Sequence, residues 1–135
     1  MRRAFVWISL GLCVIVLAGI VVQLYLIASF MFGETGALDA HKVVGGAVVH
    51  PAEVLVFLIS LAAWWKNWRN VAVSFSLALL GTIQVAFVGS LDDPSNGYVH
   101  GLHGGLVLFV AALAVYIARR ETRALRVGAP RTAPA

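Results

Sequence analysis

Charged residues and cysteines are both scarce in this sequence. Only 12% of its 135 residues are charged, against about 25% in ordinary soluble domains. A soluble core of this size could not hide the 61% of residues that are hydrophobic. The chain is therefore predicted to be a membrane protein. Its single cysteine, Cys13, excludes an internal disulfide and any CxxC redox or zinc motif, and we expect it to be a small core residue.

Several catalytic and binding motifs are also missing. The sequence has no phosphate loop, no HExxH zinc motif, no nucleophile elbow and no nucleic-acid-binding module. Its length leaves no room for a separate catalytic module of normal size. We therefore expect no nucleic-acid partner, and any redox activity would be that of an electron carrier rather than a hydrolase or a transferase.

Long apolar runs are what the sequence does contain. Each is near or above the roughly 20 residues that cross a bilayer as a helix. The predicted spans are residues 5–32, 43–65, 71–91 and 98–118. These runs predict an all-α, integral membrane four-helix bundle over residues 1–120. The remaining residues, 121–135, form a basic tail with too little apolar periodicity to pack, and we expect it to be disordered or to lie on anionic headgroups.

The charges are distributed unevenly between the two sides of the predicted bundle. Nine of the ten lysines and arginines flank the spans on the side of the termini and the 66–70 turn, whereas loops 33–40 and 92–97 carry acids. By the positive-inside rule both termini are cytoplasmic, and the protein is expected in a bacterial cytoplasmic membrane. Three tryptophans on the basic side fit an interfacial aromatic belt: Trp64, Trp65 and Trp68.

The outer ends of the second and fourth spans repeat one another. Residues 41–52 and 100–111 are identical at five of twelve positions, which are one His, two Gly, one Val and one Ala. In the preceding spans, Gln23 corresponds to Gln84. We infer two repeated helical hairpins related by a pseudo-twofold axis along the membrane normal. Such an axis would place His41 and His100 at equal depth on opposite sides.

This pairing of histidines suggests a haem site. On each helix the His, the Gly four residues later, the Val seven later and the Ala eleven later share one face. Two facing imidazoles suit the axial positions of a haem b iron, so we predict His41 and His100 as ligands. Gly45 and Gly104 would then approach the ring edge. His103, three residues after His100, is an alternative ligand, but the repeat favours His100 and leaves His103 the lesser role of lining the pocket or bonding an edge of the cofactor.

Lys42, together with the outer loops, is placed to meet the haem propionates. With both axial positions filled by imidazole, one-electron transfer or haem handling is the expected activity. The bilayer and the haem are the expected partners. A membrane redox partner, a quinone and a homodimer all stay open.

Two other interpretations fit the same residues. The glycines and histidines are also typical of helix packing in a non-enzymatic accessory subunit. Alternatively, Glu53 and His50 would serve a proton-coupled carrier of small solutes, since an acid inside the membrane is a functional candidate. Glu53 bonded to His50 would equally fix helix packing. Pro51 between them is expected to loosen the backbone near residue 47.

At His41-x3-Gly45 and Val99-His100-Gly101-Leu102 the chain resembles a family of small uncharacterised bacterial four-helix membrane proteins. More distantly it resembles one four-helix half of haem A synthase, and it shares its histidine pattern with b-type membrane cytochromes. The resemblance to haem A synthase implies a haem near the outer face, held by histidines of the second and fourth helices. The chain departs from that family at Leu38, which replaces a catalytic Glu, and at Lys42, which replaces an Arg.

Overall fold

A computed structural model describes residues 1–86 and 97–127, and the regular elements among these residues are all helices, with no strand. The elements, in chain order, are α1 (Arg2–Met31), α2 (Gly36–Val44), a π-helical turn η1 (Gly45–Val49), α3 (His50–Trp64), α4 (Trp68–Ala86) and α5 (Gly97–Val127). Because α2, η1 and α3 follow one another without a break, they form a single membrane-length helix. The described chain thus has four helices long and apolar enough to span a bilayer, which confirms the all-α fold class.

The turn between α1 and α2 depends on one glycine. Gly33 has φ +103°, a backbone conformation that side chains disfavour. Its N–H donates to the Phe30 carbonyl at 3.0 Å, and the Glu34 N–H donates to the Ser29 carbonyl at 3.0 Å. This hydrogen-bond pair is a Schellman motif, which satisfies the last carbonyls of α1. The chain therefore reverses within a few residues, and the second helix begins at Gly36, inside the predicted loop 33–40.

The turn between α3 and α4 is closed by a capping asparagine. Asn67 directly precedes α4, and its Oδ1 accepts a hydrogen bond from the Asn70 N–H at 3.2 Å. An N-cap bond of this kind satisfies one of the free donors at a helix start. The two helices are consequently joined by a very short connection.

The π-helical turn η1 lies one turn before Pro51. Proline has no N–H, so the carbonyl of residue 47 loses its usual partner. The His50 N–H instead donates to the Gly45 carbonyl, five residues back. The loosened backbone expected near residue 47 is therefore present as one wide turn, which adds a residue to the helical register.

The four long helices pack in a ring. In the described residues α1 lies against α3 and α5, and α4 lies against the same two helices, whereas α3 and α5 are diagonal to each other. The middle of the bundle is filled by fully buried side chains, namely Cys13, Val16, Val56, Leu77, Ala114 and Ile117. Cys13 is confirmed as a small core residue.

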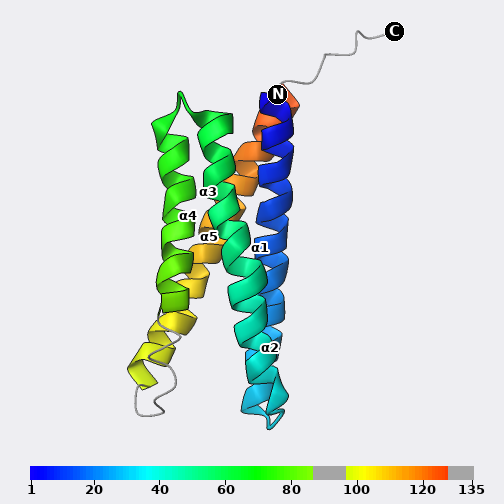
Figure 1. Ribbon diagram of the computed structural model, residues 1–135, viewed down its shortest axis with the longest axis vertical. Coiled ribbons are helices and arrows are strands. Elements are labelled where there is room, and N and C mark those ends of the chain that lie inside the picture. The colour runs from blue at the N-terminus through cyan, green and yellow to red at the C-terminus, as the bar shows by residue number, and fades with distance from the viewer. Residues whose placement is uncertain (87–96, 128–135) are drawn as a thin grey trace, which may run out of the picture.

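The two ends of the bundle differ in character (Figure 1). At one end, α5 finishes beside the start of α1, where Leu125 packs against Val6 and Ala63. We call this the basic end, since it carries Arg2, Arg3 and the arginines of the last third of α5. The other end, with the α1–α2 turn and the start of α5, carries His41, His100 and His103, and we call it the histidine end.

One predicted boundary is wrong. The sequence predicts a disordered tail from residue 121, but α5 continues as a regular helix to Val127. Glu121 and Leu125 are buried in this extension, so it packs against the bundle. Residues 128–135 lie outside the described residues, as do residues 87–91 at the end of the predicted third span.

Candidate functional site

His41 is held at the histidine end by the backbone of α1. Its imidazole is half-buried, and Nδ1 lies 3.2 Å from the carbonyl oxygen of Gln23. A carbonyl only accepts hydrogen bonds, so Nδ1 is the nitrogen that carries the proton. The Nε2 lone pair is then left for a ligand. Metal-binding histidines commonly have this arrangement, in which a backbone carbonyl fixes the tautomer.

The imidazole of His103 on α5 faces His41. The two ring centroids are 6.3 Å apart and the ring planes make an angle of 63°. Gln84 of α4 supports His103 from the other side. In the amide orientation that satisfies both of its polar atoms, Gln84 Nε2 lies 2.9 Å from His103 Nδ1 and Oε1 accepts from the Val107 N–H.

The backbones around these imidazoles stand well apart. Within the described ranges, no Cα atom of α2 comes within 8 Å of one in α4 or α5. A Cβ added at Gly46, Gly101, Gly104 or Gly105 would meet no heavy atom of the described chain within 4 Å. Gly45 is different, because a Cβ there would overlap the Gln23 amide. The backbones of α2 and α5 are therefore separated at this end, and the side chains of His41 and His103 fill the distance between them.

Gln23 also carries an unsatisfied polar atom. Its Oε1 is buried and has no hydrogen-bond partner among the residues that the structure describes. Buried amide oxygens are normally paired, and an unpaired one at a site requires an explanation. The nitrogen of the same amide, not this oxygen, is the atom that faces Gly45, one turn from His41.

The structure brings only some of the predicted site residues together. His41 and His103 are in ring contact, while His100 is exposed on α5, about one turn nearer the helix start. Lys42 is exposed next to His41. The sequence predicts that Val48 shares the inner face with His41, and that prediction is wrong, since Val48 is 45% exposed. The extra residue of the η1 turn brings Val49 to the inner face in its place.

A second polar group lies deeper, on α3. Glu53 is 2% exposed, and its Oε2 lies 3.4 Å from His50 Nδ1. The carboxylate rests directly on Gly81 of α4, where a Cβ would overlap it. The glycine thus makes room for the acid at the α3–α4 contact. These contacts match the interpretation in which Glu53 and His50 fix helix packing.

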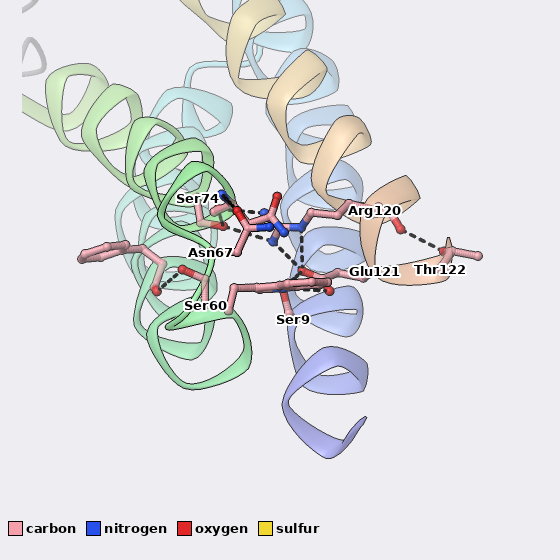
Figure 2. Close-up of polar contacts among 11 residues, drawn as sticks. Ser9, Ser60, Asn67, Ser74, Arg120, Glu121 and Thr122 are labelled. Atoms are coloured by element: carbon pink, nitrogen blue, oxygen red, sulfur yellow. Dashed lines mark hydrogen bonds and ion pairs between the residues drawn. The ribbon is translucent and has the colours of Figure 1, made fainter. Parts of the chain in front are cut away.

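A third polar cluster, at the basic end, is centred on a carboxylate that sequence reasoning assigned to the tail (Figure 2). Glu121 is fully buried. It accepts hydrogen bonds from Ser9 Oγ at 3.3 Å, from Trp64 Nε1 at 3.1 Å and from Arg120 at 2.5 Å. The same Arg120 guanidinium donates to the Asn70 carbonyl at 2.7 Å. Glu121 and Arg120 together therefore connect all four long helices.

Only two of the three tryptophans at this end fit the predicted aromatic belt. Trp65 and Trp68 are 63% and 71% exposed, as a belt requires. Trp64 turns inward to Glu121, and its ring lies between two guanidinium groups. Arg2 is 4.5 Å and Arg120 5.1 Å from the ring centroid. A signal for this cluster was present in the sequence: Glu121 is the single acid among the arginines that follow the fourth run.

Comparisons with protein-family models, curated proteins and solved structures found no match to this chain.

Proposed function

We propose that the protein binds a b-type haem at the histidine end and serves electron transfer or haem handling in the membrane. The observation that carries this proposal is the pair of imidazoles of His41 and His103, which face each other across two separated helices. Two metal–nitrogen bonds of about 2 Å, together with the half-widths of two rings, span about 6 Å. The observed 6.3 Å between ring centroids matches that span.

The residues around the imidazoles fit a flat ligand. An added Cβ at Gly46 on η1 or at Gly104 on α5 would meet no heavy atom of the described chain within 4 Å, so these two positions would leave room for a ring edge. Lys42 is the cation adjacent to His41 and would pair with a propionate. A haem held by these two imidazoles would supply one-electron chemistry.

The geometry favours His103 over His100 as the ligand opposite His41. His103 is the α5 histidine in ring contact with His41, whereas His100 is exposed. Ligation requires the tautomer with the proton on Nδ1. Rotating the Gln84 amide by half a turn would offer Oε1 to that proton, and it would break the hydrogen bonds of the amide with the His103 carbonyl and the Val107 N–H. Gln84 would then support His103 as the Gln23 carbonyl supports His41.

We also propose the two repeated hairpins and the orientation that follows from the charges. The repeat is supported by the sequence alignment, in which Gln23 corresponds to Gln84 and His41 to His100. The contacts correspond only loosely, because the Gln23 backbone carbonyl lies beside His41, whereas the Gln84 side-chain amide lies beside His103, three residues after His100. The basic end carries arginines from both α1 and α5 and would face the cytoplasm of a bacterium. The haem would then lie near the outer face.

The test is the absorbance of the purified protein and four single variants, each expressed with adequate haem supply. The parent is expected to copurify with about one haem per chain and to give a low-spin bis-imidazole spectrum. His41→Ala and His103→Ala should each lose the low-spin spectrum, since one axial ligand is removed. His100→Ala and His50→Ala should retain it.

A colourless, folded protein that takes up no added hemin would overturn the proposal, and the helix-packing role would then lead. Loss of the spectrum in His100→Ala, with retention in His103→Ala, would restore the ligand pair that the sequence repeat predicts. Helical content by circular dichroism confirms that each variant is folded.

A further inference from the structure

A hollow of about 940 Å³ opens at the basic end of the bundle, far from the histidines. It is bounded by the start of α1, the end of α3 and the second half of α5. Five arginines take part in its wall, and they are Arg2, Arg3, Arg119, Arg120 and Arg123. Because of these positive charges, the wall would attract an anionic ligand.

The wall changes in character along α5. Ala112, Val115 and Tyr116 line the part nearer the middle of the bundle, and Arg119 and Arg123 line the part nearer its end. From Ala112 to Arg123 the helix rises about 16 Å, at about 1.5 Å per residue. The wall of the hollow is therefore apolar toward the middle of the bundle and strongly basic toward its end. A membrane changes from acyl chains to headgroups in the same direction.

Two of the arginines are already engaged with the protein. Arg120 is bonded to Glu121 and to the Asn70 carbonyl, and Arg2 stacks on Trp64. Arg119 and Arg123 are exposed and lie four residues apart, on one side of α5. Like charges at this spacing repel each other on a helix. An anion bound between them would relieve that repulsion.

A second hollow, of about 420 Å³, lies against the first. It shares Val115, Arg119 and Arg123 with the larger hollow and adds Leu17 and Arg126 to its wall. The pair of exposed arginines thus stands between two grooves that both have apolar floors. A phosphate held by that pair would have a groove for an acyl chain on either side.

We propose that this surface is a binding site for an anionic phospholipid, with the headgroup phosphate between Arg119 and Arg123 and an acyl chain along Ala112, Val115 and Tyr116. A soluble phosphate compound fits less well, because it would leave the apolar part of the hollow uncovered. Clustered arginines at the edge of membrane helices suit anionic headgroups. The site is independent of the haem proposal, since it lies at the opposite end of the bundle.

The test compares two double variants that lose the same charge at the same end. Arg119→Gln with Arg123→Gln removes the proposed phosphate ligands, whereas Lys66→Gln with Arg69→Gln removes two exposed cations at the α3–α4 turn, outside both hollows. Binding of phosphatidylglycerol to the detergent-solubilised full chain is titrated by native mass spectrometry, with phosphatidylcholine as the neutral comparison.

Phosphatidylglycerol affinity should fall by roughly five-fold for each arginine removed, hence about twenty-five-fold in the first double variant. The second double variant should bind as the parent does, and inorganic phosphate should not compete. Equal losses in both variants would show a non-specific charge effect and overturn the proposal. Competition by inorganic phosphate at the lipid's own concentration would identify a soluble anion as the occupant and overturn it as well.

A variant without a change of charge keeps the proposal falsifiable if the arginine variant fails to fold. Ala112→Trp fills the apolar part of the hollow and should lower phosphatidylglycerol affinity several-fold. Leu108→Trp, at a position 71% exposed and outside the hollow, is the matched control and should leave the affinity unchanged. Unchanged affinity in Ala112→Trp would show that no acyl chain occupies the hollow.

Discussion

The buried carboxylates, Glu53 and Glu121, are accommodated in different ways. Glu121 is surrounded by donors from Ser9, Trp64 and Arg120, which compensate for the loss of water around a charge. Glu53 has a single polar contact within hydrogen-bond distance among the described residues, His50, and otherwise rests on a glycine. The first acid is thus held by polar partners, and the second mainly by shape.

A substitution at the glycine beneath Glu53 tests that role of shape. Gly81→Ala would place a methyl group where the carboxylate lies, and the α3–α4 contact would have to open. Overpacking of this kind costs about 1–3 kcal/mol. We therefore expect the variant to unfold at a lower temperature than the parent in the same detergent, as measured by circular dichroism.

Gly11→Ala is the control for Gly81→Ala. Gly11 is also within a membrane-length helix, but an added Cβ there meets no described heavy atom within 4 Å. Alanine has the higher helix propensity, so this variant should match or exceed the parent in unfolding temperature. Equal stability of both variants would show that Glu53 moves aside at little cost.

Single residues were predictable where their role is local. Cys13 as a core residue follows from the small apolar character of a free cysteine, and the contact between His50 and Glu53 follows from their spacing along one helix. The contact between Glu121 and Ser9 joins residues 112 positions apart, and no periodic pattern in the sequence predicts it. The choice of His103 as the neighbour of His41 likewise depends on how two separate helices are rotated.

Among the elements, the π-helical turn η1 has the largest effect on the candidate site. Its additional residue rotates α2 relative to α3, and so determines which side chains of α2 face α5. The sequence indicated a loosened backbone from Pro51, but a proline does not specify how the register is restored. The prediction of Val48 on the inner face failed for that reason.

Replacing the proline tests the origin of η1. Pro51→Ala restores an N–H that can bond the carbonyl of residue 47, so we expect a regular α-helix in place of the wide turn. One residue of register is about 100° of rotation, which would move side chains of α2 by several ångströms. The distance between spin labels at exposed Val43 and Leu102, in a Cys13→Ala background, should change accordingly.

Labels at exposed Leu58 on α3 and Leu79 on α4 provide the control distance, because both lie on the far side of η1 from α2. That distance should be the same in the parent and in the Pro51→Ala variant. If the distance between labels at positions 43 and 102 is also unchanged, then Gly45 and Gly46, rather than the proline, produce the turn.

At the scale of the whole molecule, the four long helices were predictable because the bilayer imposes their length and composition. Their ring order follows from short connections between consecutive helices. The extension of α5 to Val127 was not predictable, because a run of arginines after a membrane span is compatible both with a continued helix and with a solvated tail. Packing against Val6 and Ala63 distinguishes the two.

The proposed orientation leads to a test with reporter fusions. A reporter that is active only in the cytoplasm should work when inserted at Asn67 or fused to the C-terminus, and one that needs the outer compartment should work only after Glu34. The physical reason is the excess of lysine and arginine at the basic end. An outwardly active C-terminal fusion would reverse the orientation and place the histidines on the cytoplasmic side.

The first and last described helices also meet at the basic end, where Leu125 of α5 packs against Val6 of α1. An even number of spans returns the chain to the side from which it started. Such a gene can be duplicated in tandem through a short linker, and the second copy enters the membrane in the same direction as the first. The same adjacency permits circular permutation, with new ends opened at Asn67 and the old ones joined.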